Sequence, residues 1–229
     1  MNNQTITDIF FDLDHTLWDF DKNSMLAFKR VFKKHAITIA VEDFIKEYEP
    51  INFDYWKLFR EDKVSKKELR RGRLIETFEL FKLNYTIEKI DELAESYIEE
   101  LPRDNHLFKG AEMILDYLVE KYTLHIITNG FNDVQHLKLT NSGIKKHFST
   151  VTTSEEIGVK KPNPLIFTSA LKKAKANASS SIMIGDTFEA DILGAENVGM
   201  ETMYYNYRKE SIPEKYIVVD HLLEIKRHL

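Results

Sequence analysis

The spacing of hydrophobic residues divides the chain into three regions: a short apolar run, a long stretch with helical periodicity, and a region where the two patterns alternate. The apolar run, Ile6 to Phe11, predicts one strand that ends in an acidic turn. A single strand leaves its backbone groups without partners, so it is expected to pair with strands from later in the chain.

The second region, from about Phe20 to Leu101, is predicted to be helical throughout. Ser65 and Glu68 have the spacing of a capping box, and Thr86 could cap a further helix. Four helices with no strand between them predict a small bundle. The residues that recur at helical spacing are Phe28, Val31, Phe32, His35, Phe44, Tyr48, Ile51, Tyr55, Leu74, Phe78, Phe81, Ile90, Leu93 and Tyr97.

The third region, from about Lys109 onward, alternates short apolar runs with helical stretches, which predicts a parallel sheet covered by helices on both faces. The first strand belongs to this sheet, so the helical region is an insertion after it. We therefore predict an α/β fold with a Rossmann-like core over residues 1–19 and 102–229, and a helical insertion over 20–101. The expected strands are Leu124 to Ile127, Phe148 to Val151, Ile182 to Ile184 and Thr202 to Tyr205, and the helical stretches include Ala111 to Lys121 and Pro164 to Ala176.

Composition narrows the classes of function. The formal net charge is −5, from 32 Lys and Arg against 37 Asp and Glu, which argues against binding to a nucleic acid polymer. The absence of cysteine excludes disulfides, thiolate catalysis and zinc–sulfur sites. No window approaches the roughly 20 apolar residues of a membrane span, and the first residues lack the pattern of a secretory signal, so we expect a cytoplasmic protein that does not bind membranes.

The first candidate for chemistry lies directly after the first predicted strand, where Asp12 and Asp14 are two residues apart. Two carboxylates at this spacing can point into the same site, where they repel each other unless a cation or a proton intervenes. Mg²⁺ prefers such oxygen ligands. On its own the pair would fit a solvated acidic loop equally well.

The ends of the other predicted strands also carry polar side chains. Thr128 and Asn129 follow the second strand, and Lys161 comes after the third. Asp186 and Asp191 follow the fourth strand in the run GDTFEAD. Each group alone could be turn or capping chemistry, but ligands of open α/β sheets bind at the carboxyl ends of the strands. Together the carboxylates, the lysine and the hydroxyl predict a site for a metal ion and a phosphate.

The order of these motifs resembles that of the haloacid dehalogenase-like hydrolase superfamily over essentially the whole chain. FFDLDHTL is similar to the first motif of that family, Thr128 in IITNG to the second, Lys161 in KKPNPLIF to the third, and GDTFEAD to the fourth. The helical insertion is similar to the first type of cap domain found in the family. The resemblance implies a Mg²⁺-dependent enzyme whose substrate is a small phosphomonoester.

The resemblance also implies a role for each motif residue. Asp12 would be the nucleophile that becomes an aspartyl phosphate, and Asp14 the general acid and then the base. Asp12, the backbone carbonyl of Asp14, and Asp186 would bind Mg²⁺, and Asp191 would support them. The dehalogenases of this superfamily lack an aspartate at the position of Asp14, so its presence favours phosphoryl transfer. The residues expected to bind the phosphoryl group are Thr128, Asn129 and Lys161.

Within the superfamily, DLDHTLWDF and the TNG triplet resemble the pyrimidine 5′-nucleotidase branch, which implies a nucleoside monophosphate as substrate. A phosphatase of a sugar phosphate or phosphoglycolate, a phosphomutase similar to β-phosphoglucomutase, and a non-catalytic protein that accepts or binds phosphate remain open alternatives. Trp18 and Phe20, just beyond the first motif, could stack on a base or pack where the two domains join. His15 stands where many members of the family have glycine, and we expect it to fill the turn.

Overall fold

The computed structural model describes residues 5–229. Residues 1–4 belong to the expected core segment and to the start of the chain that was expected to lack a secretory signal, and they lie outside the described residues. The described chain forms two compact units: residues 5–20 with Asn105–Leu229, and Asp21–Asp104. The sequence placed the corresponding boundaries after residues 19 and 101.

The first unit is built on a parallel six-stranded sheet with the order β3-β2-β1-β4-β5-β6 among the described residues. This confirms the predicted α/β class with a parallel sheet, and all five expected strands are present. The short edge strand β6 was not expected, because three residues carry too little pattern to predict a strand. The strands are β1 (Asp8–Phe11), β2 (Thr123–Thr128), β3 (Phe148–Thr153), β4 (Ser181–Gly185), β5 (Glu201–Tyr205) and β6 (Ile217–Val219).

Strand β1 lies in the middle of this sheet, although its neighbours are far away in the sequence. Asp8 is in register with Thr123 of β2 on one side and with Ser181 of β4 on the other. Ile9, Phe10 and Phe11 are all fully buried, as expected of a strand that is covered on both faces. Because all strands are parallel, their carboxyl ends meet at one edge of the sheet, and the candidate residues follow these ends.

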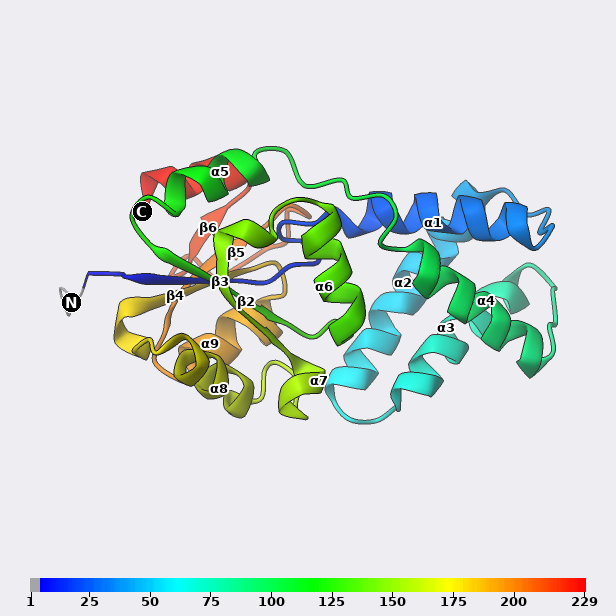
Figure 1. The fold of residues 1–229 in the computed structure, drawn as a ribbon. Helices are drawn as coiled ribbons and strands as arrows, with labels where there is room; N and C mark the ends of the chain where they lie inside the picture. Colours follow the sequence, from blue (N-terminus) through cyan, green and yellow to red (C-terminus); the bar gives the residue numbers. More distant parts are fainter. Residues whose placement is uncertain (1–4) are drawn as a thin grey trace. The chain divides into compact units, whose positions relative to one another are not determined.

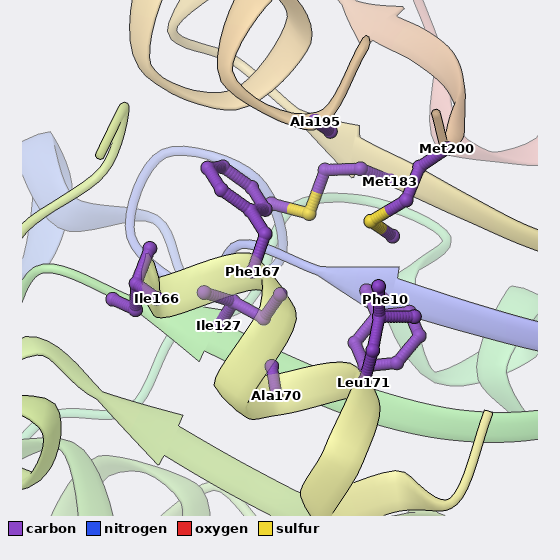
Figure 2. Packing of buried hydrophobic residues seen from close by; sticks show 9 residues of the cluster. All are labelled: Phe10, Ile127, Ile166, Phe167, Ala170, Leu171, Met183, Ala195 and Met200. Atoms are coloured by element: carbon purple, nitrogen blue, oxygen red, sulfur yellow. The ribbon is translucent and has the colours of Figure 1, made fainter. Parts of the chain in front are cut away.

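Helices cover both faces of the sheet. Figure 1 shows α5 (Ala111–Leu118) on one side together with the C-terminal segment, and α8 (Pro164–Ala174) and α9 (Gly194–Glu196) on the other. Figure 2 shows apolar side chains of α8, among them Phe167, gathered against the strands with Phe10 and Met183. Helices α5 and α8 end two to three residues earlier than the apolar spacing suggested. The unit also contains α6 (Asn132–Asn141), α7 (Ser154–Ile157), a π-helical segment (Phe188–Leu193), and 3₁₀ turns at Lys145–His147, Ala178–Ser180 and Leu222–Arg227.

Helix α6 was not among the helices predicted from the spacing of apolar residues. Its buried residues are Val134, Gln135, Lys138 and Leu139, so half of its buried face is polar. Surface helices are usually predicted from a continuous apolar stripe on the buried face, and polar residues interrupt this stripe in α6. The two buried polar residues of α6 both reach into the candidate site.

The second unit consists of four helices with no strand between them, as the sequence predicted for this region. They are α1 (Phe20–Lys34), α2 (Val41–Arg60), α3 (Lys66–Leu80) and α4 (Ile87–Glu100), the first of which begins at the unit boundary. The predicted capping box is present at α3, where Ser65 and Glu68 each bind the other's backbone N–H, and Thr86 caps α4. No helix in the described part of the chain is both long and apolar enough to cross a membrane.

Aromatic rings fill the interior of the helical unit. Phe28 lies at its centre and contacts the rings of Phe44, Tyr48 and Tyr97 at centroid distances of 4.3–4.9 Å. The predicted face of α2 is correct at Phe44 and Tyr48 but continues with the polar residue Asn52.

The positions expected to continue the apolar face of α2, Ile51 and Tyr55, are only half-buried. The Tyr55 hydroxyl donates to a carboxylate oxygen of Glu76 instead, at 2.5 Å. Arg73 of α3 is buried, donates to Asn52 Oδ1 at 2.7 Å and lies against the rings of Tyr48 and Tyr97, as a structural residue of this unit would.

Candidate active site

Asp12 and Lys161 meet at the carboxyl ends of the central strands. Asp12 directly follows β1, and its Oδ1 accepts a hydrogen bond from Lys161 Nζ at 2.6 Å. The same ammonium lies 2.7 Å from Asp191 Oδ1 and donates to the carbonyl of Ile127 at 2.8 Å. Lys161 is 2% exposed, so the ammonium is held in place by three oxygens rather than by solvent.

Three carboxylates, two of which contact this ammonium, lie close together. Asp12, Asp186 and Asp191 each offer one oxygen atom, and these three atoms lie within 4.8 Å of one another. Asp191 reaches the group from the π-helical segment because Gly185, the last residue of β4, has no side chain, and a Cβ there would lie 2.3 Å from Asp191 Oδ2. Asp191 Oδ2 also accepts the backbone N–H of Thr187 at 3.0 Å.

The electrostatics of the group favour a bound cation. Burial raises the pKa of Asp12 to about 7, with the neighbouring carboxylates adding to the effect and Lys161 opposing it. The pKa of Asp186 is also raised well above its ordinary value, by burial and then by the charges of Asp12 and Asp191. Burial alone would lower the pKa of Lys161, but the carboxylates of Asp12 and Asp191 raise it. Three carboxylates, two of them buried and one partly buried, leave an excess of negative charge beside one ammonium, and this oxygen-rich donor set suits Mg²⁺.

Asp14 points away from this group, toward helix α6. Its Oδ1 accepts a hydrogen bond from Lys138 Nζ at 2.6 Å, and its Oδ2 accepts one from Gln135 Nε2 at 2.9 Å. The carboxylate of Asp14 is therefore not part of the acidic group, and only its backbone carbonyl is left as a metal ligand. The two aspartates of the first motif thus lie in different surroundings, although they are two residues apart.

Thr128 lies at the end of β2 and is 1% exposed. Its Oγ1 accepts hydrogen bonds from the backbone N–H of Gly130 at 3.1 Å and from Gln135 Nε2 at 2.6 Å. A hydroxyl has two acceptor lone pairs and one proton, so this arrangement leaves the proton of Thr128 available for a further acceptor.

Asn129 uses its side chain to fix the backbone of Lys161. Its Nδ2 donates to the Lys161 carbonyl at 3.0 Å, and its Oδ1 accepts the Lys161 N–H at 2.8 Å. Any contact of Asn129 with a phosphoryl group is therefore left to its backbone N–H. The side chain instead links the ends of β2 and of the loop that carries the lysine.

His15 occupies the turn after β1 with a φ of 64°, a left-handed backbone conformation that glycine adopts without strain. Its Nδ1 lies 2.8 Å from the Tyr207 hydroxyl, and the guanidinium of Arg208 is close by. Burial, together with the charge of Arg208, lowers the pKa of His15 to about 3, so the ring is neutral at physiological pH. His15 fills the turn, as expected, and the contact with Tyr207 connects it to the segment after β5.

Trp18 and Phe20 are buried rather than available for stacking. Trp18 is fully buried, and Phe20 is 8% exposed. The ammonium of Lys138 lies 4.2 Å from the ring centroid of Trp18 and 5.2 Å from that of Phe20. These rings therefore form the surroundings of a buried lysine, which favours the packing interpretation over contact with a base.

Three residues of this arrangement were missed by the sequence argument. Gln135 and Lys138 are three positions apart on α6, a spacing that places them on one face of a helix that starts just after the Thr128 strand. That spacing was the available signal. Thr16 closes the first motif, is fully buried and donates to Asp186 Oδ1 at 3.3 Å. It was visible in the motif but was given no role.

Comparison with known proteins identifies similar chains. Residues 9–205 match the family described as haloacid dehalogenase-like hydrolase. Pyrimidine 5′-nucleotidase YjjG of Escherichia coli (strain K12) is 34% identical, over 90% of this chain and 88% of its own length. Pyrimidine 5′-nucleotidase PynA of Streptococcus pneumoniae is 33% identical, over 86% and 83%. A glyceraldehyde 3-phosphate phosphatase of Pyrococcus abyssi is 34% identical, over 88% and 82%.

Among solved structures, the magnesium-bound form of the HAD-hydrolase YfnB of Bacillus subtilis is similar over 99% of both chains, with a TM-score of 0.90 and 26% identity. The similarity therefore extends through both the sheet-containing segments and the helical insertion.

Proposed function

The chain belongs to the haloacid dehalogenase-like hydrolases, and we propose that it is a Mg²⁺-dependent phosphatase that acts on pyrimidine nucleoside monophosphates through an aspartyl phosphate. The family match confirms the resemblance drawn from the four motifs. The observation that carries the proposal is the separation of the two aspartates of the first motif: Asp12 lies against Lys161 and the acidic group, and Asp14 lies against α6.

In the proposed reaction, Asp12 attacks the phosphorus atom and forms an acyl phosphate with it. Asp14 gives a proton to the oxygen of the leaving alcohol as the P–O bond breaks. Asp14 then takes a proton from a water molecule, which attacks the phosphorus and releases inorganic phosphate from Asp12. The two carboxyl groups can perform opposite tasks because their surroundings differ.

Lys161 and Thr128 are proposed to hold the phosphoryl oxygens. The ammonium of Lys161 supplies positive charge where negative charge is redistributed in the transition state. Thr128 has its proton free to donate, since both of its lone pairs are used. The backbone N–H of Asn129 would add a further donor.

Asp12 and Asp186, with the backbone carbonyl of Asp14, would hold Mg²⁺, and Asp191, which also contacts the Lys161 ammonium, would support them. When bound, the ion would offset the charge of the carboxylates and polarise the phosphoryl oxygens. The raised pKa values of Asp12 and Asp186 support this assignment, because they mark carboxylates without enough positive charge around them.

Two of the relatives support a nucleotide as the substrate, since both are named as pyrimidine 5′-nucleotidases. The helical unit would select the leaving group as a cap domain. The relative of Pyrococcus abyssi acts on glyceraldehyde 3-phosphate according to its name, which makes a short sugar phosphate the second candidate substrate. A cytoplasmic location stays a prediction of the sequence.

The proposal is tested by phosphate release from UMP, dUMP, dTMP, purine monophosphates, glyceraldehyde 3-phosphate, hexose phosphates and phosphoglycolate, with Mg²⁺ and with excess EDTA. We expect metal-dependent release that is fastest with a pyrimidine nucleotide and needs no bisphosphate activator. Asp12→Asn is the inactive reference, and Asp116→Asn is the matched control, because Asp116 is an exposed carboxylate paired with His147.

Each alternative predicts a different result from this panel. Release led by a sugar phosphate would keep the mechanism and overturn the nucleotide assignment. Turnover that requires a bisphosphate and returns the phosphoryl group to the sugar would indicate a phosphomutase. No release from any of the compounds would overturn the phosphatase proposal.

A further inference from the structure

Helix α6 supplies hydrogen-bond donors to both carboxylate oxygens of Asp14. Lys138 Nζ binds Oδ1 at 2.6 Å and Gln135 Nε2 binds Oδ2 at 2.9 Å, so the plane of the carboxylate is fixed at two points. Neither residue belongs to the four motifs by which the family was identified. Asp14 itself is accessible, since its side chain is 21% exposed, whereas the side chain of Lys138 is 2% exposed.

Lys138 also lies close to two aromatic rings. Its ammonium lies 4.2 Å from the centroid of the Trp18 ring and 5.2 Å from that of Phe20. Both rings come from the segment that follows the first motif, as Asp14 does. The segment that contains Asp14 therefore also contains the aromatic rings that pack against Lys138, the lysine that binds Asp14.

Gln135 connects Asp14 with Thr128. The two protons of its amide nitrogen go to Asp14 Oδ2 and to Thr128 Oγ1, which it binds at 2.6 Å. Because the Thr128 hydroxyl accepts from Gln135 and from the backbone of Gly130, its own proton must point elsewhere. One fully buried amide thus holds the side chains of both Asp14 and Thr128.

Gly130 makes room for this amide. A Cβ at position 130 would lie 2.1 Å from Gln135 Nε2 and 2.4 Å from its Cδ. The glycine of the TNG triplet is therefore explained by the glutamine that packs on it, five residues later in the chain. This is an independent indication that the position of the Gln135 amide matters.

We propose that Lys138 and Gln135 are positioning residues of the reaction: they hold the Asp14 carboxyl where it can give its proton to the leaving oxygen, and Gln135 also directs the Thr128 hydroxyl toward the phosphoryl group. The inference rests on the proposed phosphatase function and adds two residues to it. Neither residue touches the substrate, and neither gains or loses a proton in the overall reaction. Their contribution is geometric, and displacement of a reacting group by about 1 Å can cost a hundredfold in rate.

The test compares two kinds of substrate in Lys138→Met. Nucleotides leave as basic alkoxides that need the proton of Asp14, whereas p-nitrophenyl phosphate has a leaving group that is stable without it. We expect kcat/KM to fall roughly 10- to 100-fold with UMP and by less than about threefold with p-nitrophenyl phosphate. The parameter kcat/KM is used because it covers the steps up to departure of the leaving group. Lys173→Met is the matched control, since it also removes a lysine–carboxylate pair but one that involves Glu156.

A double-mutant cycle with Asp14→Asn separates positioning from a general effect on structure. If Lys138 acts through Asp14, then adding Lys138→Met to Asp14→Asn should change kcat/KM with UMP by less than about threefold. Losses that simply add, or equal losses with both substrates, would overturn the inference. Should Lys138→Met not fold, Gln135→Met provides a second test, because it keeps the length of the side chain and removes the hydrogen bonds to both Asp14 and Thr128. Its loss of kcat/KM should be larger with UMP than with p-nitrophenyl phosphate, since only the Thr128 part affects both substrates, and equal losses would overturn the inference.

Failure of this inference can be told apart from failure of the proposed function. If the unmodified protein releases no phosphate from any substrate, the proposed function is wrong. If it does release phosphate, and Lys138→Met and Gln135→Met match it on UMP, only the positioning role is wrong.

Discussion

Replacing Gly130 by alanine should move the Gln135 amide without altering any residue that is proposed to touch the substrate. The backbone at Gly130 does not have the positive φ that would strain an alanine, so the change acts through its Cβ alone. This Cβ would lie 2.1 Å from Gln135 Nε2, and contacts below 3.0 Å essentially do not occur. The amide must therefore retreat by roughly 1 Å.

A shift of this size breaks both hydrogen bonds of the amide. Distances of 2.6 Å to Thr128 and 2.9 Å to Asp14 would increase beyond the range of a hydrogen bond. With Asp14 held only by Lys138, and with the Thr128 hydroxyl free to turn, we expect kcat/KM for UMP to fall roughly 10- to 100-fold. The loss of hydrogen bonds in a buried place should cost about 1–3 kcal/mol of folding free energy, which lowers Tm by roughly 2–10 °C.

The assay measures kcat/KM with UMP and with p-nitrophenyl phosphate, together with thermal unfolding, in Gly130→Ala and in Gly199→Ala. Gly199 has a φ of 83° and open space around it, so alanine there should destabilise by about 1–2 kcal/mol through the backbone alone. We expect Gly199→Ala to lose stability and keep its kcat/KM. A Gly130→Ala protein with unchanged kcat/KM for UMP would refute the reasoning, and so would an equal loss in both variants.

Three further predictions concern the nucleophile, the sheet and the helical unit. Asp12→Asn, which is nearly isosteric, should abolish phosphate release while circular dichroism shows an intact fold, and appreciable residual turnover would rule out Asp12 as the nucleophile. His125 has a lowered pKa, chiefly through burial and despite Asp8, so it takes up a proton less readily when folded than when unfolded. The free energy of unfolding should therefore fall as the pH drops below about 6.5, and His125 should contribute at most about 1.4 kcal/mol per pH unit to this fall. Denaturant titrations of His125→Gln at several pH values should lack this contribution. Phe28→Ala should cost about 3–5 kcal/mol, because it empties the centre of the aromatic core of the helical unit, and a loss below about 1 kcal/mol in guanidinium unfolding would contradict that packing.

The central strands of the sheet were predictable because they are buried on both faces and form continuous apolar runs. Strand β1 and the run from Ser181 to Gly185 are examples in which nearly every residue points into the interior. The rule that ligands bind at the carboxyl ends of parallel strands then placed the candidate residues at one edge. The pattern of apolar residues was enough for this part of the fold.

Helix α6 was not predictable by the same means, because its buried face includes Gln135 and Lys138. Their burial depends on partners from distant parts of the chain, namely Asp14 and the ring of Trp18. Similarly, α2 continues its buried face with Asn52 because a buried arginine of α3 needs an acceptor. In both helices a polar residue is buried for a reason that appears only when the tertiary partners are known.

The position of β1 in the sheet also constrains how the polypeptide can assemble during translation. Its residues are synthesised before those of the other five strands of the described sheet, and Thr123 and Ser181, the partners of Asp8, follow more than one hundred residues later. At about 5–20 residues per second, the ribosome needs on the order of ten seconds or more to deliver both neighbouring strands. During this time the four helices of Asp21–Asp104 are complete and rich in local contacts, so they can fold first. The apolar strand that leads to Asp12 stays unpaired during this time, so we expect it to be a segment of the nascent chain that a chaperone protects.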